Sequence, residues 1–322
     1  MLARLMKRLV ASNFRFLIWT GLLCLGWTGC ATAPPKVELP ASLDIPSKIE
    51  LTEVPFHPQG EYQCGPASLA MTLEWSGVAI TPDQLKPEVY TPSRQGSLPP
   101  DMIGAARRHG RVAYPIHRIE DVLEEVAGGH PVIVLQQLKS LFQASWHYAV
   151  VIGYDLDEHE IILHSGVEAR EVLSLDEFAS TWQPWGQWGL LTLSPQKFPA
   201  TAREEVYLKA VIGLEQTERW TEAQQAYAQA ADRWPHNETA WIGLGNSRYA
   251  LKNLAGAEQA FRSAVDAAPQ SGAAYNNLAH VLMELGRPDE ALEVINQAIR
   301  FGGPMAEVFQ KTRTEIQQQI DG

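Results

Sequence analysis

The sequence predicts an α+β domain followed by an all-α domain of helical repeats. From about residue 54 to 197, helix-like patterns come first and short apolar runs of strand length follow them. From residue 204 onward, alanines recur at intervals of 34, as at Ala223, Ala257 and Ala291. A length of 322 residues fits about two domains at roughly 100–200 residues each. The net charge of −11, without a basic cluster in either domain, argues against a nucleic-acid partner.

Residues 1–30 have the pattern of an export signal. A positively charged start precedes an apolar core, 16–27, that is short for a membrane span; its basic residues are Arg4, Lys7, Arg8 and Arg15. Small residues stand directly before Cys30, in a pattern that resembles a bacterial lipobox. We therefore expect lipid on Cys30 and a place in the cell envelope, on a bacterial membrane facing the periplasm, with the outer membrane favoured. A plain signal peptide or a single anchor helix are the alternatives.

A tether and the α+β domain follow. Residues 31–53 hold four prolines and no hydrophobic period, which predicts a semi-extended tether before a domain at 54–197. The patterns predict helices at 64–75, 81–85, 100–108 and 119–127, and another starting at Ser174 with Glu177 in the capping-box position. They predict a loop at 90–100 and strands at 112–116, 131–135, 148–152, 160–164 and 188–193.

Cys64 is the first candidate for chemistry. Pro66 suits a first helical turn, so Cys64 opens the helix, where the dipole and free N–H groups favour a thiolate. Lipidation of Cys30 and removal of Cys24 would leave Cys64 as the one free thiol of an exported protein. A lone thiol in an oxidising compartment is a liability unless its reactivity is used. The alternative is a buried, inert cysteine.

A nucleophilic cysteine needs a basic partner, and His147 is the candidate. It directly follows Trp146 at the start of the predicted strand 148–152, where it can face a helix N-terminus across a cleft. The alternative is an ordinary polar residue at the entry to a strand. His57 lies on the approach to the helix. Six other histidines lie at helix ends, at turns or in the repeats: His109, His117, His130, His159, His236 and His280.

These residues carry a resemblance. Gln59, the run Cys64-Gly65-Pro66-Ala67 at a helix start, and the run from His147 to Val151 opening a strand resemble the papain-like cysteine peptidases that process bacteriocin leaders at a double glycine. The resemblance covers about residues 54–193. It implies that Cys64 is the nucleophile, that His147 is the general base, and that Gln59 shares the oxyanion hole with the Cys64 N–H.

The chain departs from this family at three places. Gln63 stands where the family has an aspartate, and Gln59 lies five residues before the cysteine where six is usual. The aspartate that orients the histidine is missing, and the sequence at its place is Leu163-His164-Ser165-Gly166. His164 or Ser165 could accept from the His147 ring, and Asp155 or Asp157 would have to fold back to do so. Of these, we favour His164 as the orienting residue.

The second half resembles tetratricopeptide repeats. Three units are expected at 204–237, 238–271 and 272–305, with a polar capping helix that extends the domain to 320. The middle unit fills the repeat pattern with Trp241, Leu244, Gly245, Ala257, Phe261, Ala264 and Pro269. The resemblance implies that this domain binds a protein or a peptide.

Together these observations predict an exported, lipid-anchored thiol peptidase that uses a Cys64–His147 dyad and binds a protein or peptide through its repeats. We expect no metal and no other cofactor, because neither Cys-x-x-Cys nor His-Glu-x-x-His occurs. A degenerate peptidase domain serving as a binding scaffold is the main alternative, and hydrolysis of other amides, such as cell-wall crosslinks, is another. The Trp182–Trp188 segment, with three tryptophans, fits core packing or a wall of the substrate groove.

Overall fold

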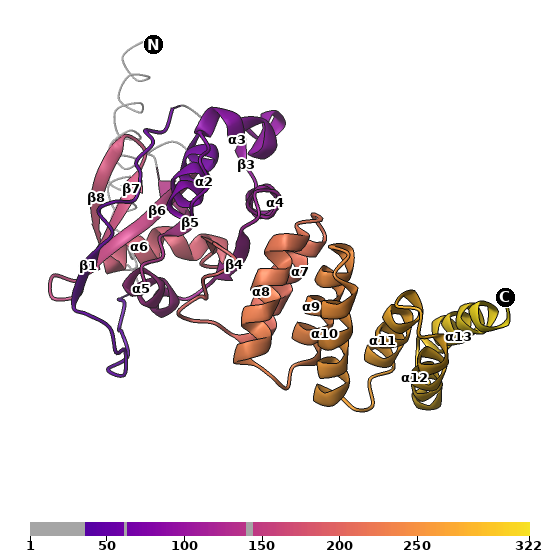
Figure 1. The fold of residues 1–322 in the computed structure, drawn as a ribbon. Coiled ribbons are helices and arrows are strands. Elements are labelled where there is room, and N and C mark those ends of the chain that lie inside the picture. The colour runs from indigo at the N-terminus through magenta and orange to yellow at the C-terminus, as the bar shows by residue number, and fades with distance from the viewer. Residues whose placement is uncertain (1–35, 61–62, 140–143) are drawn as a thin grey trace, which may run out of the picture. The chain divides into compact units, whose positions relative to one another are not determined.

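The computed structural model describes residues 36–60, 63–139 and 144–322 (Figure 1). The predicted signal segment, with Cys30, lies outside the described residues, and so does the start of the predicted tether. Among the described residues, no helix has both the length and the apolar character that a membrane crossing requires.

The first domain is built on an antiparallel sheet. Its order is β4-β9-β5-β6-β7-β8, and β1 also pairs with β6, which makes seven strands in the described residues. These strands are β1 (Lys48–Glu50), β4 (Val112–Ile116), β5 (Val132–Lys139), β6 (Ala144–Asp155), β7 (Glu160–Ser165), β8 (Glu168–Ser174) and β9 (Gly189–Leu193). β5 and β6 are buried on both faces, which explains why they read as continuous apolar runs.

Alternate residues of these strands enter two different cores. Ile133, Leu135 and Tyr148 pack with α2 (Cys64–Trp75), together with α3 (Pro82–Val89) and α4 (Pro99–Arg108). Val132 and Val134 pack on the other face with α5 (Ile119–Ala127) and α6 (Leu175–Trp182). The sheet therefore carries helices on both faces, and α2 is one of the elements that covers it.

The helix signals of the sequence are explained by the observed caps. Thr81 and Gln84 form a reciprocal capping box at α3, and the Ser174 hydroxyl accepts from the Glu177 N–H at the start of α6. α2 begins at Cys64 with Pro66 in its first turn. Because the cysteine is fixed at a helix start, its place in the domain follows from the packing of α2.

Three expectations need correction. The described part of the tether, 36–53, is not free of the domain, because β1 pairs with β6 and Val37 and Leu39 pack against the core. The expected loop at 90–100 contains a short hairpin of β2 (Tyr90–Thr91) and β3 (Gly96–Ser97), joined by a 3₁₀ turn. β6 begins at Ala144, so His147 lies inside the strand, because pairing with β5 continues outward through Gln136↔His147.

Seven helices follow the sheet domain. They are α7 (Glu204–Glu215), α8 (Trp220–Arg233), α9 (Glu238–Ala250), α10 (Leu254–Ala267), α11 (Gly272–Glu284), α12 (Pro288–Phe301) and α13 (Ala306–Asp321) among the described residues. Small residues let neighbouring helices approach: a Cβ on Gly243 or Gly245 would overlap the ring of Tyr227 or Phe261. Each helix pair lies within one of the predicted units, and α13 follows the last of them.

Candidate active site

A cleft of about 800 Å³ opens at the N-terminal end of α2. Gln59, Cys64 and His147 all line it, although they come from a loop, a helix and a strand that are far apart in sequence. Tyr148, Ser97 and Gly166 also line the cleft. The structure therefore brings together the three residues that the sequence nominated as nucleophile, base and oxyanion donor.

The β2–β3 hairpin packs tightly against the start of α2. A Cβ on Gly65 would meet the side chain of Ser97 at well under 3.0 Å, so only glycine fits at this position. The Ser97 backbone carbonyl accepts from the Tyr148 hydroxyl at 3.2 Å, whereas its own hydroxyl is buried without a partner among the described residues. The hairpin, which the sequence did not predict, thus holds the cysteine end of the helix in place.

Cys64 is partly buried, and this burial raises the pKa of its thiol. The backbone N–H groups of Tyr148, Gly65 and Cys64 itself pull the pKa down, but they do not offset the burial. The resting sulfur is therefore a thiol, which is the opposite of the thiolate expected from the helix end alone. A partner that removes the proton is needed for attack.

The His147 ring is available as that partner. Burial lowers the pKa of His147, and the half-buried Glu171 on β8 acts in the opposite direction. The ring is therefore neutral near pH 7 and can accept a proton. Its Nε2 lies 3.1 Å from Ser165 Oγ on β7. If Nε2–H donates to that hydroxyl, Nδ1 is left as the base for the thiol.

His164 does not take the orienting role that we expected for it. Its ring bonds the backbone carbonyls of Ala169 and of Val54, the latter at 3.1 Å, and stacks edge-on against Phe56. Successive residues of a strand point to opposite faces, so only one of His164 and Ser165 can face His147. Ser165 is the residue that does. Asp155 is also excluded, because it is paired with Lys48 at 2.6 Å.

Gln59 is buried and firmly positioned. Its Nε2 donates to Tyr148 O at 3.2 Å and to Ser68 Oγ at 3.3 Å, and its Oε1 accepts from the Gly166 N–H at 3.2 Å. Both amide hydrogens therefore have acceptors in the resting structure. An oxyanion would have to replace one of these long bonds to receive a hydrogen bond from Gln59.

The outer cleft has an aromatic wall. Trp146 and Trp185 pack edge-on with ring centroids 4.3 Å apart, and both remain substantially exposed. Trp182 is fully buried in the core, and Trp188 packs on Tyr148. Trp182 therefore has the core-packing role considered for this segment, whereas Trp185 forms part of the wall of the cleft. No cluster of acidic, histidine or cysteine side chains suited to a metal occurs among the described residues.

Comparison with known proteins identifies the two domains by family. Residues 51–189 match the Peptidase C39 like family, and residues 208–272 and 248–303 match two tetratricopeptide-repeat models. The chain carries a C39-like peptidase domain followed by tetratricopeptide repeats. The predicted fold class is therefore confirmed. No match was found among the curated proteins.

Solved structures resemble each half of the chain. A C39-like peptidase from Bacillus anthracis is 18% identical, covers 45% of this chain and 97% of its own, and has a TM-score of 0.38. The TPR2B domain of yeast Sti1, in a pHsp70 complex, is 18% identical over 34% of this chain and 91% of its own (TM-score 0.33). The Yersinia enterocolitica type III secretion translocator chaperone SycD is 13% identical, covers 36% of this chain and 83% of its own, and has a TM-score of 0.34.

The sequence did not indicate two residues that act on the catalytic groups of the C39-like domain. Glu171 lies on β8, a strand with five exposed positions and three charged residues, which gave no strand signal. Ser97 lies in the unpredicted hairpin. Ser165 was named only beside His164, and knowing the face of β7 that looks toward His147 would have separated the two.

Proposed function

We propose that the C39-like domain is a cysteine peptidase that cleaves peptide bonds with Cys64 and His147. The observation that carries the proposal is the convergence of Gln59, Cys64 and His147 on one cleft, with the His147 ring bonded to Ser165. No hydrogen bond joins Cys64 to His147 in the described part of the chain. Such bonds often tighten only when substrate binds.

The chemistry starts from a neutral pair. Cys64 Sγ attacks the substrate carbonyl carbon while its proton passes to His147 Nδ1, and the negative charge moves to the carbonyl oxygen. The Cys64 N–H and Gln59 stabilise that oxygen. The C–N bond then breaks, the amine leaves with the proton from His147, and a thioester remains on Cys64. Water, deprotonated by His147, hydrolyses the thioester and restores the thiol.

Ser165 has a weaker role than an aspartate would have. A hydroxyl can fix the tautomer and direction of the ring, but it carries no charge to stabilise the imidazolium that forms. We therefore propose a slow peptidase rather than an inactive one. A double-glycine leader is not part of the proposal, because nothing in the described cleft selects one.

The test incubates the full chain with a peptide library and, in parallel, with murein fragments, and measures hydrolysis of each. We expect peptide cleavage that falls by about 10³-fold or more in Cys64→Ala. Equal rates for the two proteins, or no cleavage at all, would favour a binding scaffold. Cleavage of murein fragments alone would move the substrate to cell-wall amides.

Two parts of the proposal concern location and partners. We propose that the protein is exported and lipid-anchored through Cys30, on the pattern of residues 1–30, and that the anchor holds it in the bacterial envelope facing the periplasm. Incorporation of labelled fatty acid into the wild type and not into Cys30→Ala tests this. Tetratricopeptide repeats generally bind proteins or peptides, and we propose that they recruit such a partner here.

A further inference from the structure

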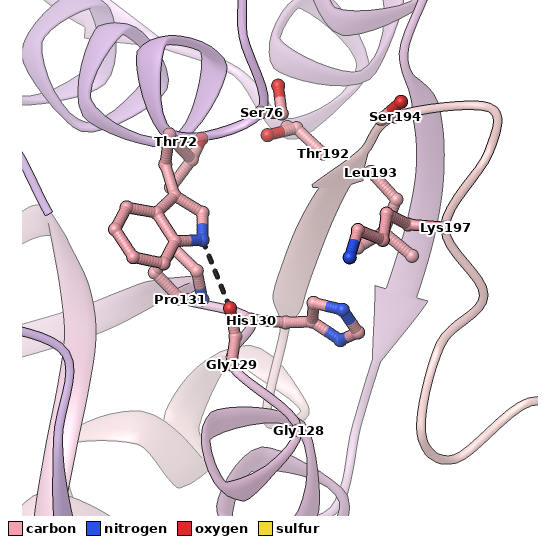
Figure 2. A pocket seen from close by; sticks show the side chains of 11 residues that line it. Thr72, Ser76, Gly128, Gly129, His130, Pro131, Thr192, Leu193, Ser194 and Lys197 are labelled. Carbon is pink, nitrogen blue, oxygen red and sulfur yellow. Dashed lines mark hydrogen bonds between the residues drawn. The ribbon is translucent and has the colours of Figure 1, made fainter.

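A second pocket, of about 380 Å³, lies at the end of α2 opposite to Cys64 (Figure 2). The ends of this 12-residue helix are roughly 17 Å apart at 1.5 Å per residue, so the pocket is separate from the cleft. Its volume falls in the range of small-molecule sites. The lining residues that bear on a ligand are Trp75, His130, Pro131, Thr192, Leu193 and Lys197.

The pocket has a positive side. Figure 2 shows the Lys197 ammonium directed toward the His130 ring from the segment after β9. Lys197 has no ion-pair partner among the described residues, and none of the described lining residues is acidic. A lysine facing a cavity without a counter-charge suits an anionic ligand.

His130 is held so that one nitrogen remains free. Its Nδ1 lies 2.8 Å from Glu125 Oε2. Glu125 is fully buried and also accepts from the N–H groups of Ala200 and Thr201 and from the Thr201 hydroxyl. An acceptor at Nδ1 places a proton there and leaves Nε2, which has no partner in the described structure, as a hydrogen-bond acceptor. These donors occupy both oxygens of Glu125, which makes no ion pair with Lys197 in the described structure.

Hydroxyl groups complete the polar side. Thr192 is 5% exposed, lines the pocket, and its hydroxyl has no hydrogen-bond partner among the described residues. The carbonyls at the end of α2 do not oppose an anion strongly, because they are already bonded: Ser76 O accepts from Arg111 at 2.9 Å and Leu73 O from Ser76 Oγ at 2.8 Å.

The remaining lining is apolar and points to an organic ligand. Trp75, Pro131 and Leu193 form this part, and the Trp75 indole N–H is bonded to Gly129 O at 3.0 Å. The described lining of the pocket holds neither an arginine fork nor a helix N-terminus, the groups that hold phosphate. One lysine, one unpartnered threonine hydroxyl and an apolar wall fit a carboxylate attached to an apolar body.

We propose that this pocket binds a small organic carboxylate, of the class formed by the carboxyl-terminal residue of a peptide. Lys197 pairs with the carboxylate, the Thr192 hydroxyl donates to it, and Trp75 and Leu193 contact the apolar body. The proposal does not depend on the activity of Cys64, because none of these residues lines the cleft.

The experiment compares binding of N-acetylphenylalanine with that of its neutral amide to the full chain, by calorimetry. We expect the acid to bind at least about tenfold more tightly than the amide, and Lys197→Met to remove that difference. Lys197→Arg should keep it, and Thr192→Val should weaken binding of the acid by about threefold. Equal affinity for the two probes, no binding of either, or binding of inorganic phosphate in place of the acid would overturn the proposal.

Matched controls separate this pocket from the cleft and from general charge effects. Lys311→Met removes a lysine that is 79% exposed on α13, and Arg94→Met removes the cation that lines the cleft. Both should leave affinity for the acid unchanged. If Arg94→Met abolishes binding while Lys197→Met does not, the probe occupies the cleft and the assignment is wrong. Circular dichroism and a thermal melt of each variant check folding.

Discussion

The contacts inside the C39-like domain and those inside the repeats differ in how far apart the contacting residues lie along the chain. In the sheet domain, Gln59 bonds Tyr148 and Gly166, which lie 89 and 107 residues away along the chain. In the repeats, helix contacts join neighbours, as Gly245 does with Phe261. A change in the sheet domain can therefore displace a distant catalytic group, whereas a change in the repeats stays local.

Among the variants that keep Cys64 and His147, Gly65→Ala should have the largest effect on catalysis. The new Cβ would overlap the Ser97 side chain and push the hairpin away from the start of α2, which displaces Cys64. A shift of about 1 Å at a reacting group costs roughly 10² in rate, so we expect kcat/KM for a peptide to fall by about that factor. Unchanged kcat/KM would show that the hairpin does not position Cys64.

Gly245→Ala is the matched change in the repeats. Its Cβ would overlap the Phe261 ring between α9 and α10, and such overpacking costs about 1–3 kcal/mol. We expect the repeats to unfold at lower denaturant concentration while cleavage of a short peptide is unaffected. If cleavage were lost at the denaturant concentration at which the repeats unfold, the two domains would unfold together. A change in the repeats would then not stay local.

Ser165→Ala tests the positioning of the base. Loss of the hydroxyl frees the His147 ring, and we expect kcat to fall about tenfold with little change in KM. Ser165→Asp should raise the pKa of His147 and move the acidic limb of the pH–rate profile upward, because a carboxylate favours the imidazolium. His164→Ala is the control: it should leave that limb in place. If the acidic limb of the pH–rate profile moved in His164→Ala and not in the Ser165 variants, His164 would be the residue that orients the His147 ring.

The pH dependence of Cys64 alkylation follows from its environment. Because burial raises the pKa of the thiol, the folded protein holds less thiolate than the unfolded chain at any pH below that pKa. Iodoacetamide should therefore label Cys64 several-fold more slowly in the folded protein at pH 7.5, and the rate should rise into the alkaline range. Rapid labelling at pH 6 in the folded state would instead indicate a thiolate and contradict the neutral pair.

Glu258→Gln should have the smallest effect. Glu258 pairs with Arg262 and Arg287 at 2.8 Å, but both arginines are more than 40% exposed. Solvent screens such pairs, so we expect the repeats to lose less than about 1 kcal/mol of unfolding free energy, and less again in high salt. Urea unfolding at two salt concentrations measures this. A loss above about 2 kcal/mol would show that the network acts as a unit.

The sequence alone determined the features that depend on local or periodic signals. Pro66 after Cys64, the Thr81 capping box and the 34-residue alanine period act over a few residues or recur, so they can be read without knowing the fold. The apolar runs of β5 and β6 were equally clear because both faces of these strands are buried.

Only the tertiary structure decided what faces the catalytic groups. β1 and β8 were missed because they mix polar with apolar residues, none of them fully buried, and because their pairing depends on β6 and β7. The choice of Ser165 over His164 rests on which face of β7 looks toward His147. The thiol form of Cys64 rests on burial by elements far away in sequence, since the helix end alone favours a thiolate. The burial of a side chain and the direction in which it points depend on contacts with residues far away along the chain. No short stretch of sequence therefore determines them.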